Sequence, residues 1–97
     1  MGWKVELSSK VYKNLKKIPK RTKESFQVLL DEIRILGPVR GNWPNYGKLS
    51  KDCHHCHLQK KGKPVYVAVW KVTDKEIKII EVNYVGIHEG ANYDLLR

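Results

Sequence analysis

The chain has 97 residues, 41% of them hydrophobic and 30% charged, which suffices for one small domain spanning residues 1–97 and argues against a disordered protein. Its apolar runs are only a few residues long and its N-terminus lacks the apolar core of a signal peptide, so we expect no membrane span, no membrane partner and a location in the cytoplasm. The 19 lysines and arginines against 10 aspartates and glutamates give a net charge of +9, which favours RNA, DNA, a ribosome surface or an acidic protein as partner.

The N-terminal part of the chain predicts a strand and then a short helix. In residues 3–8, apolar and polar side chains alternate, which is typical of a strand. Ser8 or Ser9 can cap a helix that begins near Lys10. The apolar face of that helix is formed by Val11, Leu15 and Ile18.

Pro19 interrupts this helix and suits the first turn of a second one. The second helix stops at Gly37, which is followed by another proline. Its apolar face is formed by Phe26, Leu29, Leu30, Ile33 and Leu36. Residues 39–47 read as a loop, in which Trp43 and Tyr46 could stack on nucleic-acid bases or pack into the core.

The second half of the chain predicts a meander of three strands, at residues 53–59, 64–72 and 77–85, joined by polar turns. Gly86 would end the last strand and leave a short tail. The resulting fold class is α+β: a small antiparallel sheet, made of the N-terminal strand and the meander, with an N-terminal helical hairpin packed on one face. We expect the other face to stay open, with Trp70 serving a structural role in the core.

The stretch "DCHHCHLQ" combines two cysteines with three histidines. Its Cys-x-x-Cys-His spacing matches a c-type haem attachment site, but such sites belong to exported proteins, and Met1 is the only methionine that could be an axial ligand. In a strand, Cys53 and Cys56 would lie on opposite faces and could not easily share a zinc ion. We therefore predict neither a metal nor another cofactor, although His55 and His57 could bind a metal with His88 as a third ligand.

Strand alternation places His55 and His57 on one face, and His54, Cys56 and Leu58 on the other. Cys56 and Leu58 then belong to the core. His55 and His57 are either polar strand residues or a site that binds phosphate and transfers protons near neutral pH, the range in which imidazole titrates.

Four segments of the sequence are informative together: "WKVELSSKVYKNLKKIPK", "NWPNYGKLSKDCHHCHL", "YVAVWKV" and "IIEVNYVGIHEGANY". They resemble the RelE/ParE superfamily of bacterial toxins from toxin–antitoxin pairs, and most closely its RelE-like cytotoxic translational repressors. The resemblance spans essentially the whole chain. It implies a fold like that of microbial RNases, cleavage of mRNA, often in the ribosomal A site, and neutralisation by a cognate antitoxin, which we expect to be acidic.

The resemblance also implies site residues. Two lysines of RelE alternate along one strand, and the matching segment here, "KLSKDCHHCHL", places His55 and His57 at those positions. An arginine of RelE after its last strand matches His88, and a tyrosine near its C-terminus matches Tyr93 with an offset of one residue. A further arginine of RelE falls near Val67, so its role is vacant or is taken by phosphate-binding lysines. The candidates for phosphate binding are Lys48, Lys60, Lys61 and Lys63.

We therefore expect the toxin of a toxin–antitoxin pair: an mRNA endoribonuclease, dependent on the ribosome, that cleaves by metal-independent attack of the 2′-OH with histidines as acid and base. The alternatives are a ParE-like toxin that inhibits DNA gyrase without cleaving RNA, or a catalytically degenerate relative. The first helix carries a lysine face that either binds ribosomal RNA or is simply solvated. That face consists of Lys10, Lys13, Lys16 and Lys17.

Overall fold

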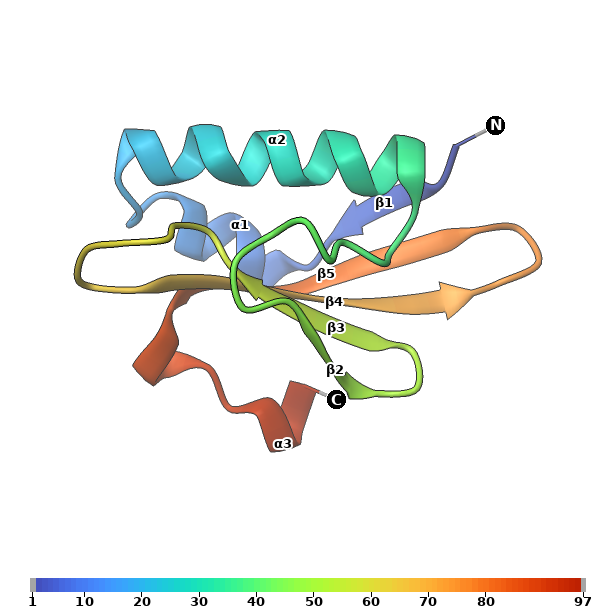
Figure 1. Cartoon of the computed structure of the whole chain (residues 1–97). Helices are drawn as coiled ribbons and strands as arrows, with labels where there is room; N and C mark the ends of the chain where they lie inside the picture. The colour runs from blue at the N-terminus through green and yellow to red at the C-terminus, as the bar shows by residue number, and fades with distance from the viewer. Residues whose placement is uncertain (1, 97) are drawn as a thin grey trace.

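The computed structural model describes residues 2–96, so that Met1 and Arg97, which end the predicted domain 1–97, lie outside the described residues. The elements follow one another as β1 (Lys4–Leu7), α1 (Ser9–Leu15), α2 (Lys20–Leu36), β2 (Gly47–Ser50), β3 (Cys53–His57), β4 (Tyr66–Asp74), β5 (Ile79–Ile87), the 3-10 turn η1 (His88–Gly90) and α3 (Tyr93–Leu96) (Figure 1). This order confirms the α+β class. No helix within residues 2–96 is both long enough and apolar enough to cross a bilayer.

The five strands form one sheet in the order β1-β5-β4-β3-β2. Strand β1 pairs parallel to β5, which differs from the antiparallel sheet that the sequence predicted. The remaining pairs are antiparallel, and those among β3, β4 and β5 form the predicted meander. Strand β2 was not expected, because its four residues follow a Gly/Pro/Asn-rich loop and show no clear alternation. It adds an edge by pairing Gly47 with His55 and Lys48 with His54. Strand β5 also continues through Gly86, where the sequence predicted its end.

Helix α1 starts as predicted, since the Ser8 side chain accepts a hydrogen bond from the backbone N–H of Val11 at 3.3 Å. It ends at Leu15, one turn before the last residue of its predicted apolar face. That residue, Ile18, is nevertheless buried in the connection to α2. The Asn14 side chain donates a hydrogen bond to the Val85 carbonyl at 3.0 Å, which fixes α1 along strand β5.

Helix α2 buries the predicted face, except at its last position. Leu36 is 64% exposed, so its assignment to the core was wrong. The next residue, Gly37, is buried instead: a Cβ atom there would lie 3.2 Å from Nε1 of Trp3. Gly37 also has φ 99°, a left-handed conformation that favours glycine and ends the helix.

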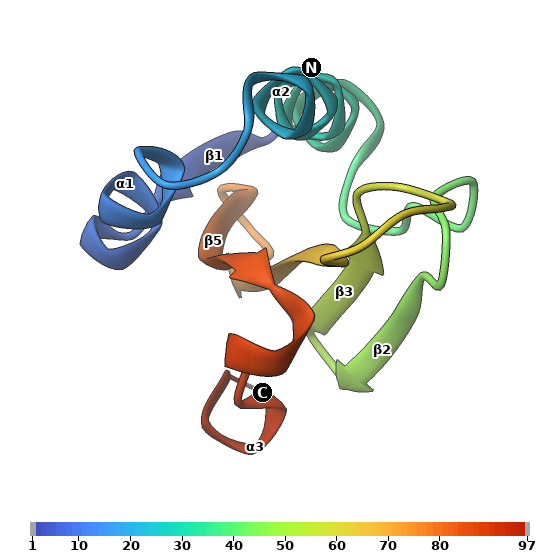
Figure 2. The same ribbon diagram turned by 90° about the vertical axis from the view of Figure 1, so that its left-hand side faces the viewer.

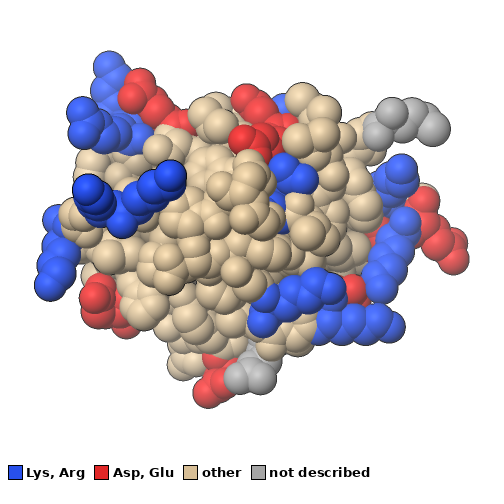
Figure 3. Space-filling model, in the orientation of Figure 1, with Lys and Arg blue, Asp and Glu red and all other residues tan. Residues whose placement is uncertain are grey.

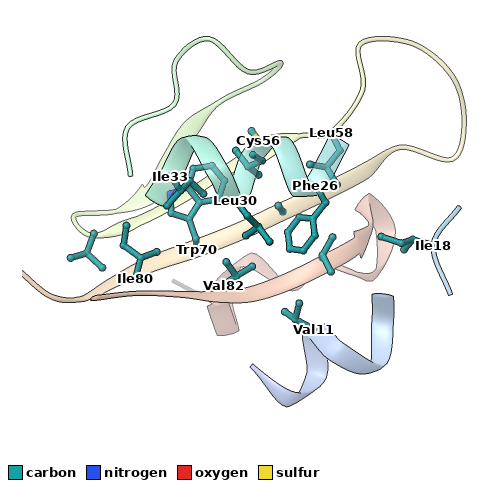
Figure 4. Close-up of a cluster of buried hydrophobic side chains, with 14 residues drawn as sticks. Val11, Ile18, Phe26, Leu30, Ile33, Cys56, Leu58, Trp70, Ile80 and Val82 are labelled. Carbon is teal, nitrogen blue, oxygen red and sulfur yellow. The ribbon is translucent and has the colours of Figure 1, made fainter. Parts of the chain in front are cut away.

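The main core lies between α2 and the sheet (Figure 4). Phe26, Leu30 and Ile33 of α2 face Trp70 and Val82 across this layer. The Trp70 indole is fully buried and donates a hydrogen bond to the Pro38 carbonyl at 2.9 Å, which confirms its structural role. The predicted core residues Cys56 and Leu58 lie in the same cluster.

The loop after α2 is held on the helix by the Glu32 carboxylate. Its Oε1 atom accepts hydrogen bonds from Arg40 at 3.3 Å, Asn42 at 2.9 Å and the Trp43 indole at 2.9 Å. These donors lower the pKa of Glu32, those of Asn42 and Trp43 most. Trp43 and Tyr46 both pack against the core, so the structure favours packing over base stacking for these two rings.

The opposite face of the sheet is less open than the sequence predicted. A second cluster of buried residues lies there, and the C-terminal segment covers part of it, on the side away from α1 and α2 (Figure 2). Its buried members are Cys53, Val67, Val69 and Tyr84. Ala91, Tyr93 and Leu96 of the C-terminal segment pack against them.

Candidate active site

His57 and His88, far apart in the chain, lie side by side in the structure. Their ring centroids are 5.6 Å apart and their planes meet at 74°. Strand β3 ends at His57, which pairs with Val67 of β4. The backbone N–H of His88 donates to the Val65 carbonyl at 2.7 Å. The backbones of both histidines are thus paired with the beginning of strand β4 and the residue just before it.

Tyr93 joins these two residues to His55. Its ring centroid lies 6.0 Å from that of His88 and 5.2 Å from that of His55. We call His55, His57, His88 and Tyr93 the histidine cluster. Gly47, opposite His55 in β2, leaves room for this ring, because a Cβ atom there would lie 3.2 Å from its Nε2.

Two polar atoms of the histidine cluster are buried and lack hydrogen-bond partners within the described residues: Nδ1 of His55 and the hydroxyl of Tyr93. Such atoms are uncommon, since most buried polar groups are hydrogen-bonded. Burial raises the pKa of Tyr93 above its usual 10.0, so the phenol stays protonated and can act as a donor.

Two imidazoles of the cluster, those of His55 and His57, favour their neutral form. Burial, followed by the neighbouring His57 and His88, lowers the pKa of His55 below its ordinary 6.5. Burial, followed by His88, likewise lowers the pKa of His57. A neutral imidazole can accept a proton at pH 7, which is what a general base must do.

His54 belongs to the core. It is 2% exposed, and its ring lies 5.9 Å from the indole of Trp70, with 6° between the planes. Its Nδ1 atom shares a 2.7 Å hydrogen bond with the Tyr46 hydroxyl. Burial lowers the pKa of His54 to about 4, with a smaller contribution from the charge of Lys48. This side chain therefore stays neutral near pH 7.

The two cysteines are buried in different clusters on opposite faces of the sheet. Burial raises the pKa of the Cys56 thiol to about 12, so it is not a nucleophile at neutral pH. Within residues 2–96, no group of three histidine, cysteine or acidic side chains is arranged to hold a metal ion.

The predicted phosphate-binding lysines separate into two places. Lys60, Lys61 and Lys63 are exposed in the connection from β3 to β4, which starts next to His57 and leads to Val65, the partner of His88. Lys48 instead pairs with His54 and so lies on the helix-covered face, away from the histidine cluster.

The lysines predicted to bind the ribosome are exposed along and just after α1: Lys10, Lys13, Lys16 and Lys17. In the view of Figure 3, lysines and arginines gather towards both ends of the molecule, with a broad area of uncharged side chains between them. The positive charge is therefore divided between both ends of the molecule and does not form a single patch on this face.

One residue next to the cluster was missed from the sequence. Tyr84 is 5% exposed, and its hydroxyl donates to the Ile87 carbonyl at 2.8 Å, directly before His88. In the sequence it is a polar residue within an apolar strand, followed by Gly86 and Gly90. Glycines at these two positions could have indicated that a large side chain such as Tyr84 packs closely against the backbone there.

Comparisons with known proteins identify a fold but no sequence family. No protein-family model matches the chain, and no curated protein matches it. Among solved structures, a mutant of the E. coli toxin RelE in the free state matches with a TM-score of 0.69 and 21% identity, over 99% of this chain and 94% of that one. The archaeal RelE–RelB complex from Pyrococcus horikoshii OT3 matches with a TM-score of 0.67 and 18% identity, over 94% of this chain and 100% of that one. The chain therefore has the fold of RelE toxins.

Proposed function

We propose that this protein is the toxin of a toxin–antitoxin pair and an mRNA endoribonuclease whose acid and base are histidines. The observation that carries the proposal is the 5.6 Å contact between the rings of His57 and His88, with Tyr93 beside them. The RelE fold supports the toxin assignment, and the fold of the RelE–RelB complex supports a cognate antitoxin as partner.

The reaction is transfer of a phosphoryl group within the RNA. His57, whose pKa is lowered, takes the proton from a 2′-OH. The 2′ oxygen then forms a bond to the adjacent phosphorus, and the bond from phosphorus to the 5′ oxygen breaks. His88 donates a proton to that leaving oxygen. The products are a 2′,3′-cyclic phosphate and a 5′-hydroxyl end, and each imidazole contributes about 10²–10⁴-fold.

The other members of the cluster shape the site around the two catalytic imidazoles. The Tyr93 ring packs against those of His55 and His88 and holds them in place, since its own hydroxyl and Nδ1 of His55 are buried. Lys60, Lys61 and Lys63 neutralise phosphates of the RNA on either side of the cleaved bond.

The partners follow from charge. An acidic antitoxin covers part of the basic surface, and the lysine face of α1 holds ribosomal RNA, so that mRNA is cut on the ribosome in the cytoplasm. Reversing the charge of Lys13 and Lys17 together should weaken association with ribosomes and leave cleavage of free RNA unchanged.

The test is induced expression with mapping of mRNA 5′ ends, followed by cleavage of a short RNA by the purified protein. The variants His57→Gln and His88→Gln keep polar side chains of similar size but cannot exchange protons near pH 7. We expect each to lower the cleavage rate at least about 100-fold. Tyr12→Phe, on the exposed surface of α1, is the control and should be fully active.

Full toxicity and unchanged mRNA ends in both histidine variants would refute the histidine mechanism. Inhibition of DNA supercoiling by gyrase, with intact mRNA in the same cells, would instead support a toxin of the ParE type. The same preparation can be used for both assays, so the two functions are separated directly.

A further inference from the structure

The hydroxyl of Tyr84 lies at the junction between strand β5 and the turn that carries His88. It donates to the Ile87 carbonyl at 2.8 Å, and the ring is held in the buried cluster beneath the C-terminal segment. Burial, and then the charge of Glu89, raises the pKa of Tyr84 above its usual 10.0. The hydroxyl therefore remains a hydrogen-bond donor throughout the neutral range.

Two glycines make room for this hydroxyl. A Cβ atom on Gly86 would lie 2.7 Å from it, and a Cβ atom on Gly90 would also lie 2.7 Å from it. Both distances are too short for a carbon–oxygen contact. The end of β5 and the far side of η1 thus close around one oxygen atom, with His88 on the segment between them.

We propose that Tyr84 is a positioning residue, whose hydroxyl holds the β5–η1 junction so that His88 faces His57. This inference rests on the proposed function, because it gives Tyr84 a role in RNA cleavage without contact to the RNA. Tyr84 touches neither the substrate nor a reacting atom. It acts through the backbone of Ile87, one peptide unit before His88.

The kinetic test compares Tyr84→Phe with the Tyr12→Phe control. Tyr84→Phe keeps the buried ring and removes only the donor. Since small displacements of a catalytic group can cost up to about 100-fold, we expect kcat for a short RNA to fall about tenfold with KM within about twofold of the wild type. In a His88→Gln background the same change should have no further effect, because there is no imidazole left to position. An equal fall in both backgrounds would overturn the inference.

A rescue experiment tests the geometry itself. Gly90→Ala in the wild type forces the new methyl against the Tyr84 hydroxyl and should lower kcat. In the Tyr84→Phe protein the nearest remaining ring atom is Cζ, 3.9 Å away, so Gly90→Ala should then cost nothing more. Gly86→Ala is the matched control: Cζ remains at 3.0 Å after the hydroxyl is removed, so this change should not be rescued.

Nuclear magnetic resonance provides a readout that is independent of activity. The chain has only four histidines, so each imidazole can be followed separately. In Tyr84→Phe the signals of His88 should shift or broaden, whereas those of His54, in the opposite core, should not change. If the wild type cleaves no RNA but the His88 signals respond, the proposed function fails and the positioning by Tyr84 stands. Unchanged His88 signals, with or without cleavage, would overturn the positioning.

Discussion

His54 and His55 are neighbours in the chain, but their rings lie on opposite faces of the sheet. The ring of His54 is stacked on Trp70, 5.9 Å between centroids, and that of His55 lies 5.2 Å from the ring of Tyr93. The alternation of a regular strand therefore gives two adjacent imidazoles different environments. One supports the core, and the other belongs to the histidine cluster.

The buried His54 predicts loss of stability in acid. Its folded-state pKa of about 4 lies below the ordinary 6.5, so between these values the unfolded chain binds more protons than the folded one. The free energy of unfolding should then fall as the pH drops from about 6.5 towards 4, by at most about 3 kcal/mol from this residue. Urea unfolding at pH 7, 5 and 4 measures it. His54→Phe, which cannot bind a proton, should show a smaller fall, and an equal fall in both proteins would contradict the assignment.

The contact between His57 and His88 predicts a linked titration. Burial is the larger cause of the lowered pKa of His57, and the charge of His88 is the second. Removing that charge with His88→Gln should raise the pKa of His57 part of the way towards 6.5, as followed by the chemical shift of its ring protons. The titration of His54 on the other face should not move. A pKa of His57 that stays the same or falls would show that the two rings do not interact.

Only part of the histidine cluster could be predicted from regular features of the sequence, because the assignment of His88 and Tyr93 to the site came from the resemblance to RelE-like toxins. Strand alternation is enough to place His55 and His57 on the same side of β3. Strand β5 lies beside β4, and β4 beside β3, so the residue after β5 returns towards the end of β3. The strand order of the sheet, which is a tertiary feature, therefore brings His88 to His57.

The features that the sequence missed depend on tertiary contacts. The face occupied by Lys48 follows from the register between β2 and β3, which four weakly patterned residues do not specify. Tyr93 and Leu96 cover the second face only because the turn η1 directs the chain back across the sheet. The fit of Tyr84 between its glycines likewise requires the turn to be in place.

The Glu32 carboxylate predicts a large effect from a single residue of α2. Glu32→Ala removes the acceptor of three donors in the following loop, and hydrogen bonds to charged groups contribute about 1.5–3 kcal/mol each. Because part of this carboxylate is solvated, we expect a total loss of roughly 2–3 kcal/mol in the free energy of unfolding. The adjacent Asp31→Ala, which breaks an exposed ion pair with Arg34 and an exposed hydrogen bond from Gln27, should cost at most about 1 kcal/mol. Chemical denaturation of both variants compares their free energies of unfolding. Equal losses would exclude a special contribution of the Glu32 carboxylate to holding the loop.

Gly47 predicts an effect on activity with little effect on stability. In Gly47→Ala the new methyl would lie 3.2 Å from Nε2 of His55, so the imidazole must move by a few tenths of an ångström. The strand itself can accept alanine, since Gly47 is not in a left-handed conformation. We expect RNA cleavage to slow several-fold, with the thermal midpoint of unfolding nearly unchanged. Loss of both properties together would mean that the substitution disturbs β2 rather than His55.

The lysines of the β3–β4 connection predict how RNA binding responds to salt. Each phosphate neutralised on single-stranded RNA contributes about 0.7 to the slope of log K against log salt concentration. Replacing Lys60, Lys61 and Lys63 with alanine should therefore weaken binding and reduce that slope by about 2. The matched control replaces Lys23, Lys75 and Lys78, three exposed lysines outside this connection and outside the lysine face of α1, and should leave the slope unchanged for a short RNA. Binding titrations between low and moderate salt distinguish the two sets. Equal changes in slope would mean that RNA binding depends on the net charge of the protein and not on specific contacts beside the histidine cluster.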